Sequence, residues 1–148
     1  MRFRRATTAD APSAHDLVQR AYGHYVERMG RRPGPMDDDY AVHAEAGELC
    51  LAEEDGALVG LLVLVDCPDH LLLANIAVDP ARQGAGLGRK LMERVEAVAR
   101  ERRRPEIRLY THRLMTENIA IYEHLGYSVT SRHDEEGFGR VFLAKPIG

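Results

Sequence analysis

The sequence predicts an α/β protein in which one mixed β-sheet carries helices on both faces. Short apolar runs of strand length alternate along the chain with segments whose apolar residues recur every three or four positions, the spacing of a helical face. Short turns separate some neighbouring strands, whereas helices separate others, so the sheet is expected to be mixed. The 148 residues, 45% of them hydrophobic, suit a single domain over residues 1–148.

Two helices are predicted to separate the first strand from the next three. Pro12 is tolerated in the first turn of the first helix, and Gly30 ends that helix. The Asp55-Gly56 pair indicates a hairpin, and the nearly unbroken apolar run over 71–78 suggests a strand buried on both faces. The predicted elements are a strand over 3–6, a helix that Thr8 or Asp10 caps and Gly30 ends, a helix over 37–46, and strands over 49–53, 57–65 and 71–78.

The second half alternates helices with strands and ends in a hairpin. Leu87 to Ala99 carries one apolar helical face, and Pro105 stops this helix. Gly126 is expected to end the last helix. The further elements are a strand over 107–111, a helix over 118–125, and closing strands over 127–131 and 141–144.

Charge and composition exclude several classes of function. Twenty Lys and Arg residues against 23 Asp and Glu residues give a net charge of −3, which disfavours binding to nucleic acid through its phosphates. The basic run Arg100 to Arg104 is interpreted as compensation of a helix dipole. No apolar run reaches the ~18–20 residues that cross a membrane. The histidines lack the spacing of a metal site, so no metal is expected.

The cysteines and the N-terminus indicate the compartment. Cys50 and Cys67 lie in apolar surroundings without CxxC spacing, which predicts buried, reduced thiols. Met1 to Arg5 is basic, but no apolar segment follows it, so no secretory signal is predicted. We therefore expect a cytoplasmic protein.

The most informative segment is a turn with three glycines at alternate positions, Gly84, Gly86 and Gly88, between an apolar strand and an amphipathic helix. Glycines allow the backbone to turn tightly and to bring several N–H groups close to a ligand. The unpaired N–H groups and the dipole of a helix N-terminus both favour an anion. The same turn carries three basic residues, Arg82, Arg89 and Lys90. The sequence therefore predicts a phosphate or pyrophosphate site.

Two common phosphate-binding motifs do not fit this turn. A P-loop requires Ser or Thr after Gly-Lys, but Leu91 follows Lys90 here. A dinucleotide fingerprint has GxGxxG spacing early in the chain, whereas this turn has GxGxG spacing after the fourth predicted strand. The alternative to a phosphate site is a glycine turn that serves only tight packing.

Residues 83–88 (QGAGLG) resemble the (Q/R)-x-x-G-x-(G/A) signature of the GNAT superfamily of acetyl-CoA-dependent N-acetyltransferases. Residues 75–80 (NIAVDP) resemble the end of the family's fourth strand. Further along, residues 119–127 (IAIYEHLGY) resemble its A-I-x-L-Y-E-x-L-G-F segment. The resemblance implies an acyl-CoA N-acyltransferase fold, with a central, mostly antiparallel sheet whose fourth and fifth strands splay apart.

The resemblance also implies that acetyl-CoA is the co-substrate. Its pantetheine arm is expected to hydrogen-bond to the backbone of Ile76, Ala77 and Val78, where one N–H is the expected oxyanion donor. The pyrophosphate is expected on the amides of the glycine turn. The matching residues are Gln83, Gly84, Ala85, Gly86, Leu87, Gly88 and Arg89.

Tyr122 matches the tyrosine that family members use as the general acid toward the departing sulfur. A phenol with a pKa of ~10 is protonated at neutral pH and can donate to a thiolate. The alternative is that Tyr122 only packs on the helix beside Ile119 and Leu125.

Asn118 lies one helical turn before Tyr122. Many family members carry a cofactor-binding asparagine seven residues before the tyrosine, and Met115 occupies that position here. Asn118 either replaces that contact with acetyl-CoA or caps the helix.

The resemblance does not identify a general base. Some relatives place a glutamate where this chain has Tyr110, and others place acidic residues on the fourth strand, where residues 73–75 carry none. His112 is the candidate catalytic base, because a histidine pKa of ~6.5 suits proton transfer. Proton removal through water, an acid among residues 37–39, or a histidine without a catalytic role are the alternatives.

The first two helices and their loop normally form the acceptor side of this fold. Here they supply Tyr22, Tyr25, Arg28, Arg31, Arg32, Asp37, Asp38, Asp39 and Tyr40. Carboxylates can hold an ammonium and arginines a carboxylate, as suits an amino-acid-like or small polyamine-like acceptor. Alternatively, the three aspartates only cap the second helix.

The sequence thus favours an N-acetyltransferase that moves an acetyl group from acetyl-CoA to a primary amine by direct attack. The acceptor is a small molecule, an amino-acid-like compound, or an N-terminal or lysine amine of a protein. The missing base glutamate makes a non-catalytic acyl-CoA-binding or regulatory module the alternative. A second copy of the chain, as a homodimer, is a candidate partner, whereas neither nucleic acid nor a membrane is expected.

Overall fold

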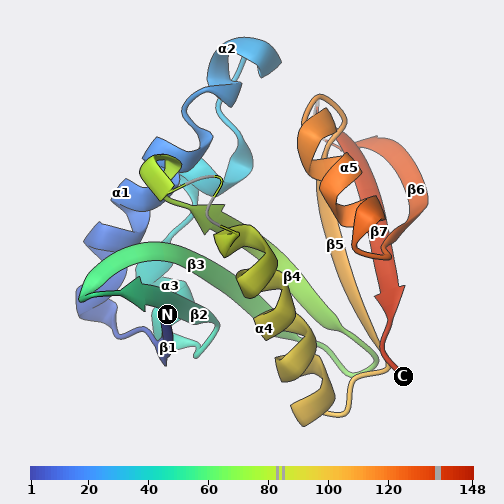
Figure 1. Ribbon diagram of the computed structural model, residues 1–148. Helices are drawn as coiled ribbons and strands as arrows, with labels where there is room; N and C mark the ends of the chain where they lie inside the picture. Colours follow the sequence, from blue (N-terminus) through green and yellow to red (C-terminus); the bar gives the residue numbers. More distant parts are fainter. Residues whose placement is uncertain (83, 85, 136–137) are drawn as a thin grey trace.

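The computed structural model describes residues 1–82, 84, 86–135 and 138–148, and these form a seven-stranded sheet (Figure 1). The strands are β1 (Arg2–Arg5), β2 (Leu49–Glu54), β3 (Ala57–Asp66), β4 (Leu71–Val78), β5 (Glu106–His112), β6 (Ser128–Glu135) and β7 (Phe138–Pro146). Their order is β1-β2-β3-β4-β5-β7-β6. In the described residues only β4 and β5 pair in parallel, which confirms the mixed, mostly antiparallel sheet.

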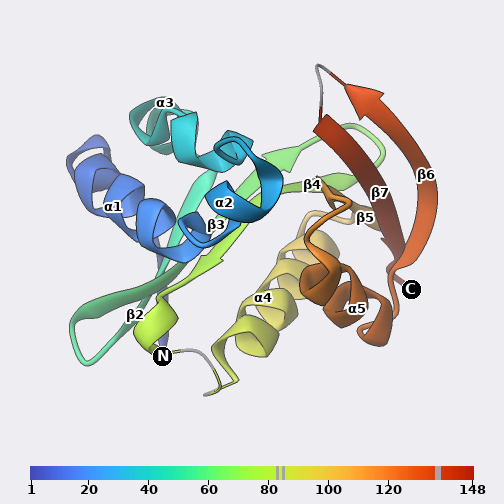
Figure 2. The same ribbon diagram turned by 90° about the horizontal axis from the view of Figure 1, so that it is seen from above.

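Helices cover both faces of this sheet, as predicted. They are α1 (Ala11–Tyr22), α2 (Tyr25–Met29), α3 (Tyr40–Glu45), α4 (Leu87–Glu101) and α5 (Thr116–His124). Figure 2 shows α1 and α3 on one side of the sheet and α4 and α5 on the other. None of these helices combines the length and apolar character needed to span a membrane.

The first predicted helix is interrupted. A turn at residues 23–24 separates α1 from α2, and the Val26 N–H donates to the carbonyl oxygen of Gly23 at 3.2 Å, the bond of a tighter turn. Glycine is a poor helix former, which accounts for the interruption. Gly30 ends α2 in the left-handed conformation with φ of 71°, as predicted.

The second predicted helix is shorter than residues 37–46. It begins at Tyr40 because the Asp39 carboxylate accepts hydrogen bonds from the N–H groups of Ala41 and Val42, at 3.0 and 3.3 Å. Asp37 belongs instead to a separate 3₁₀ turn, η2 (Gly34–Asp37). The loop that carries η2 therefore remains distinct from α3.

The expectation that β4 is buried on both faces is wrong. Its residues alternate between buried and half-buried, because part of the strand borders an opening in the sheet. A β-bulge also shifts the pairing of β4 with β3: Val63 pairs with Asn75 while Leu64 pairs with Leu73, so Ala74 is the extra residue. The bulge turns Asn75 toward the face that α1 and α3 cover.

The opening arises because β4 and β5 pair only at their beginnings. Leu71, Leu72 and Leu73 pair with the first part of β5, and the remainder of β4 pairs with β3 alone. Figure 1 shows the two strands diverging from their paired ends. The splayed fourth and fifth strands implied by the resemblance are therefore present.

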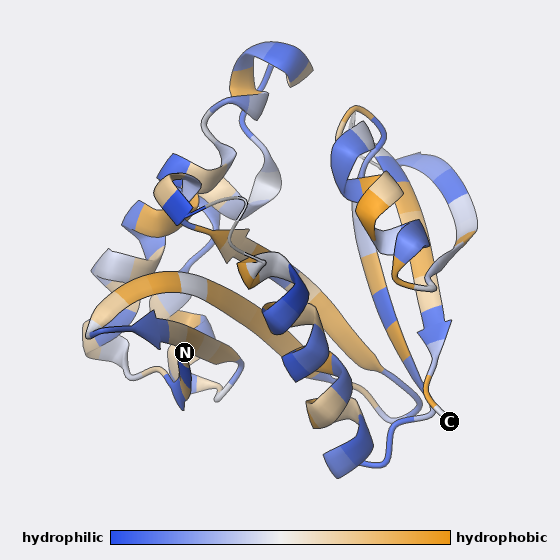
Figure 3. Cartoon of the chain, viewed as in Figure 1, coloured by the Kyte–Doolittle hydropathy of each residue, from blue (hydrophilic) through white to orange (hydrophobic). Residues whose placement is uncertain are grey.

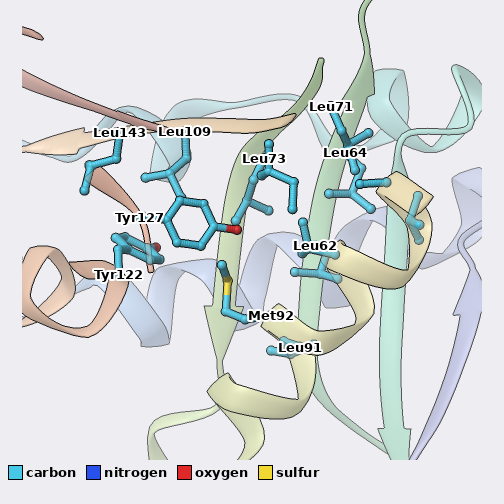
Figure 4. Close-up of a cluster of buried hydrophobic side chains, with 14 of the residues drawn as sticks. Leu62, Leu64, Leu71, Leu73, Leu91, Met92, Leu109, Tyr122, Tyr127 and Leu143 are labelled. Atoms are coloured by element: carbon cyan, nitrogen blue, oxygen red, sulfur yellow. The ribbon is translucent and has the colours of Figure 1, made fainter. Parts of the chain in front are cut away.

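Apolar cores lie on both sides of the sheet, and one of them joins the two diverging halves. In this core, Leu73 of β4 and Met92 of α4 belong to the same cluster as Leu109 of β5 and Tyr122 of α5. Figure 4 shows these side chains close together, and Figure 3 shows the hydrophobic character of the central strands. The core therefore fixes how β4 and α5 face each other across the opening.

The cysteines are more accessible than expected. Cys50 and Cys67 are both free thiols, but each is half-buried rather than fully buried. Burial raises the pKa of the Cys50 thiol, although Arg94 opposes this effect.

Candidate active site

Two adjoining cavities open where β4 and β5 diverge. The larger, of about 700 Å³, lies among β4, the glycine turn and the N-termini of α4 and α5, and we call it the glycine-turn cavity. Its lining includes Val78, Arg82, Gly84, Gly86, Gly88 and Met92. The smaller, of about 330 Å³, lies between β4, β5 and the loop that carries η2, and we call it the strand cavity. Its lining includes Asp38, His43, Asn75, Tyr110, His112 and Arg140.

The cavities meet at four residues from three elements, since each of these residues lines both cavities. They are Tyr22, Ile76, Asn118 and Tyr122. Two of the four, Asn118 and Tyr122, come from α5, whereas Ile76 lies on the part of β4 that β5 leaves unpaired. The junction therefore joins the open strand edge to α5.

The glycine turn leaves open space beside the N-terminus of α4. Gly84 and Gly86 have φ of +88° and +77°, in the region that favours glycine, and Gly86 is the N-cap of α4. A Cβ on Gly84, Gly86 or Gly88 would meet no atom of the described structure within 4 Å. The packing-only alternative therefore does not hold for these glycines. Gln83 and Ala85, predicted to contribute amides, lie outside the described residues.

The other residues predicted around this turn separate into two groups. Leu87 is buried, and both Leu87 and Arg82 line the glycine-turn cavity. Arg89 points elsewhere: its side chain is 79% exposed, and its guanidinium lies 3.5 Å from Glu93 one helical turn away. Arg82 thus supplies a cationic side chain to the wall of this cavity.

The free edge of β4 presents backbone groups to the opening. Because the Asp79 N–H donates to the Val59 carbonyl, the alternation of the antiparallel ladder turns Ala77 toward β3 and Ile76 and Val78 toward the free edge. The carbonyl of Ile76 accepts a hydrogen bond from the Tyr22 hydroxyl at 2.9 Å. Of the three predicted backbone contacts, Ile76 and Val78 therefore have the orientation that a ligand needs.

Tyr122 is buried at the junction of the cavities, with 8% of its surface exposed. Burial, and to a lesser extent Tyr25, raises the pKa of its phenol well above the ordinary value. Its hydroxyl makes no hydrogen bond to the described residues, whereas its ring packs 6.0 Å from that of Tyr127 (Figure 4). Tyr122 is thus a protonated phenol that faces the space between the cavities.

Asn118 does not cap α5. The N-cap is Met115, and Asn118 lies within the first turn of the helix, with its amide nitrogen 3.9 Å from the Met115 sulfur. The capping alternative is therefore wrong, while its position at the junction agrees with the cofactor contact.

His112 lines the strand cavity at the end of β5. Burial and the positive charges of Arg113, Arg140 and Arg31 lower its pKa, so the ring is neutral at pH 7. Its Nδ1 accepts a hydrogen bond from the Leu114 N–H at 3.1 Å, which places the ring proton on Nε2. In this tautomer the ring is a hydrogen-bond donor toward its surroundings.

The three neighbouring aspartates have three different environments. Asp37 pairs with Arg32 at 2.9 Å, and Asp39 caps α3. Asp38 alone of the three lines the strand cavity. The capping alternative from the sequence is thus correct only for Asp39.

Asp38 belongs to a hydrogen-bonded chain of charged groups. Its Oδ2 lies 2.7 Å from Nε2 of His43, and Nδ1 of the same ring lies 2.8 Å from Oε1 of Glu48. Burial lowers the pKa of His43, but the bonds to Glu48 and Asp38 outweigh it, and the pKa is raised above its ordinary value.

Two residues expected on the acceptor side lie on the other side of the junction. Tyr25 and Arg28 line the glycine-turn cavity, where the Arg28 guanidinium contacts the Glu117 carboxylate at 2.7 and 2.9 Å. This pair joins α2 to α5 across the opening. The sequence could not indicate it, because 89 residues separate the partners.

Asn75 is a residue of the site that sequence reasoning did not identify. Within the described residues it is the one polar side chain that is fully buried, with 5% exposed. It accepts from the Tyr22 hydroxyl at 2.7 Å and donates to the Tyr40 hydroxyl at 2.9 Å, which in turn donates to the Pro35 carbonyl at 2.7 Å. The available signal was a single amide residue within the apolar run of β4.

Tyr110, His43 and Arg140 also line the strand cavity without having been predicted to bind a ligand. They come from β5, α3 and β7. Nothing in their local sequence distinguishes them from surface residues. Of the described residues, no group of three His, Cys, Asp or Glu side chains has an arrangement that could hold a metal ion.

The fold and the site together define a class of protein. A sheet that splays between its fourth and fifth strands, with a glycine turn and a helix N-terminus beside the free edge, has the arrangement implied by the acyl-CoA N-acyltransferase resemblance. The chain belongs to the acetyltransferase (GNAT) family, which it matches over residues 11–127.

Individual relatives agree with this assignment. The chain is 38% identical to mouse (Mus musculus) N-alpha-acetyltransferase 80 over 66 residues, which are 45% of this chain and 20% of that protein. It thus spans about a fifth of the length of this relative.

Solved structures share the fold at low sequence identity. The ribosomal-protein-S18-alanine N-acetyltransferase from Escherichia coli has a TM-score of 0.78 and 24% identity, over 99% of this chain and 93% of that chain. The PaiA N-acetyltransferase from Thermoplasma acidophilum, solved in complex with coenzyme A, has a TM-score of 0.80 and 16% identity, over 98% of both chains.

Proposed function

We propose that this protein is an N-acetyltransferase that transfers the acetyl group of acetyl-CoA to a primary amine. The observation that carries the proposal is the position of Tyr122, a buried phenol that lines both cavities at their junction. Transfer of the acetyl group requires a proton donor close to the point where the two substrates meet. The position of Tyr122 at the junction of the cavities suits this role.

The glycine-turn cavity fits acetyl-CoA. The N–H groups at the start of α4 and the Arg82 guanidinium suit a pyrophosphate, and no described side chain caps this helix end. The N–H of Ile76 and the backbone groups of Val78, which point toward the free edge of β4, suit the amide-containing arm of the molecule. Asn118 is proposed as a further contact, since it lines the same cavity.

In the proposed reaction the amine nitrogen bonds to the thioester carbonyl carbon, and the carbon–sulfur bond breaks. Because its pKa is raised, the Tyr122 phenol is protonated before the reaction. It donates this proton to the departing thiolate. An N–H of Ile76 or Val78 stabilises the charge on the carbonyl oxygen. The amine must lose a proton before or during the attack.

The hydrogen bond from Leu114 disfavours His112 as the direct acceptor of that proton. With Nδ1 occupied, Nε2 carries the ring proton, so His112 is better suited to donate a hydrogen bond to the acceptor. Proton removal through water agrees with this arrangement.

Two measurements test the proposal together. Calorimetry measures CoA binding, and a thiol-detecting dye measures CoA release from acetyl-CoA with a panel of alkyl and aryl amines. Tight binding together with amine-dependent thiol release is the expected result. Binding without any amine-dependent release would favour the non-catalytic acyl-CoA-binding module instead.

A further inference from the structure

We infer that Asp38 binds the ammonium group of the acceptor, so that the natural acceptors are alkyl amines that are cations at neutral pH. This inference rests on the proposed function and assigns a substrate class to the strand cavity. It separates alkyl primary amines from aryl amines, which are neutral at pH 7.

The charge of the cavity supports this assignment. Among the described residues that line the strand cavity, Asp38 is the only carboxylate. The chain of Asp38, His43 and Glu48 holds two carboxylates and one imidazole, so its net charge is negative whether or not the ring is protonated. A cation that enters the cavity is therefore attracted to Asp38.

The opposite wall favours the same orientation. Arg140 of β7 and His112 of β5 lie there, and the arginines near His112 depress the pKa of its ring. Because the His112 ring is neutral, it is the positive charge of Arg140 that directs an ammonium group away from β7 and toward Asp38.

Two hydrogen bonds hold the Asp38 carboxylate in place, and its oxygens can still accept further hydrogen bonds. The Asp39 N–H donates to Oδ1 at 2.9 Å, and the His43 ring donates to Oδ2. Each carboxylate oxygen accepts about two hydrogen bonds, so both retain room for an ammonium donor. The Asp38 side chain is 44% exposed, which leaves it reachable from the cavity.

The buried amide of Asn75 links β4 to residues on both sides of Asp38. Asn75 donates to Tyr40 and Tyr40 donates to Pro35, so the loop that carries η2 is tied to the strand at both ends of Asp38. The ammonium site thus has a fixed position relative to Ile76, the next residue along β4.

The test compares Asp38→Asn with Asp37→Asn, the same change one residue away at a position outside the cavity. The substrates are the alkyl amine of the panel that reacts fastest and an aryl amine of similar size. Asp38→Asn is expected to lower kcat/KM for the alkyl amine at least about tenfold, which corresponds to about 1.4 kcal/mol. In Asp38→Asn, kcat/KM for the aryl amine and the affinity for CoA should change little. Asp37→Asn should leave kcat/KM for both amines and the affinity for CoA unchanged.

A second readout separates failure of this inference from failure of the proposed function. NMR titration of the alkyl amine into the protein–CoA complex measures acceptor binding whether or not turnover occurs. Asp38→Asn should weaken binding, whereas Asp38→Glu, which keeps the charge, should retain most of it. Equal loss for both amines, no loss for either, or no binding of the alkyl amine to the unmodified protein would overturn the inference.

Discussion

The glycine-turn cavity and the strand cavity share a junction but are built by different means. Backbone groups from one continuous segment, the end of β4, the turn and the start of α4, form much of the first. Side chains from α1, α2, α3, α5, β4, β5, β7 and the loop that carries η2 form the second. Binding in the first therefore depends on space and backbone geometry, whereas binding in the second depends on charge and on the tertiary packing that brings the side chains together.

The largest effect is expected at the junction, where the two cavities act on the same reaction. Tyr122→Phe should lower kcat about 100-fold, because it removes the proposed proton donor. CoA affinity should remain within about twofold, since the hydroxyl makes no hydrogen bond to described residues. Steady-state kinetics and calorimetry measure the two quantities.

Tyr127→Phe is the matched control for this change. Tyr127 packs against Tyr122, but its hydroxyl is buried without a hydrogen-bond partner in the described structure, and it lines neither cavity. Its removal should leave kcat unchanged and stabilise the fold by up to about 1 kcal/mol. An unchanged kcat in Tyr122→Phe, or equal losses in both variants, would contradict the assignment of the general acid.

The next effect tests whether packing governs the strand cavity. Asn75→Leu leaves Tyr40 without its buried donor and should lower the free energy of unfolding by about 2 kcal/mol in urea denaturation. KM for the amine should rise as the loop that carries η2 loosens, while CoA affinity should stay the same. Tyr40→Phe, which breaks the same chain, should shift both quantities in the same direction. A rise in KM without loss of stability would show that Asn75 contacts the acceptor itself.

A smaller effect tests whether space governs the glycine-turn cavity. Gly88→Val places a side chain where no described atom lies within 4 Å, and the φ of Gly88 is not among the positive values. The fold should therefore tolerate it, with a change in unfolding free energy below about 1 kcal/mol. CoA affinity measured by calorimetry should fall at least about tenfold, which is about 1.4 kcal/mol. Unchanged affinity would place the pyrophosphate elsewhere.

The smallest effect concerns how the stability of the fold depends on pH through His43, which pairs with Asp38 and Glu48. The folded-state pKa of His43 lies above its unfolded value, because Glu48 and Asp38 favour the imidazolium. This stabilisation is fully present below the unfolded pKa of ~6.5 and is lost as pH rises through the folded-state pKa. His43→Gln should thus lose more stability at pH 6 than at pH 9, as urea denaturation at several pH values would measure. If the free energy of unfolding changed with pH in the same way in His43→Gln and in the unmodified protein, the ion pairs of His43 with Asp38 and Glu48 would be contradicted.

Local patterns predicted much of the fold and the glycine-turn cavity. The apolar run over 71–78 gives the bounds of β4, and the Asp55-Gly56 pair forms the turn between β2 and β3 with both φ values positive. Gly86 begins α4 as the turn motif indicates. Each of these features depends on a few adjacent residues, so sequence reasoning was sufficient for them.

Features that depend on distant partners could not be predicted in this way. The three aspartates 37–39 look alike in the sequence, but only the packing of α3 and of the loop that carries η2 makes Asp38 a cavity residue. The bulge at Ala74 depends on the pairing with β3 and decides which face Asn75 occupies. The break between α1 and α2 also escaped, because the apolar spacing continues through Gly23.

The sequence by itself determined that a glycine turn follows an apolar strand and precedes a helix, since chain connectivity holds those groups together. It also determined that a tyrosine lies on a later helix with a neighbouring asparagine. The tertiary structure alone decided that Tyr122 lies at the junction of two cavities and that Asp38, linked through His43 to Glu48, lines one of them. The physical reason is that burial, pKa and charge at a site are sums over neighbours in space, and in this protein the neighbours come from segments as far apart as α1 and β7.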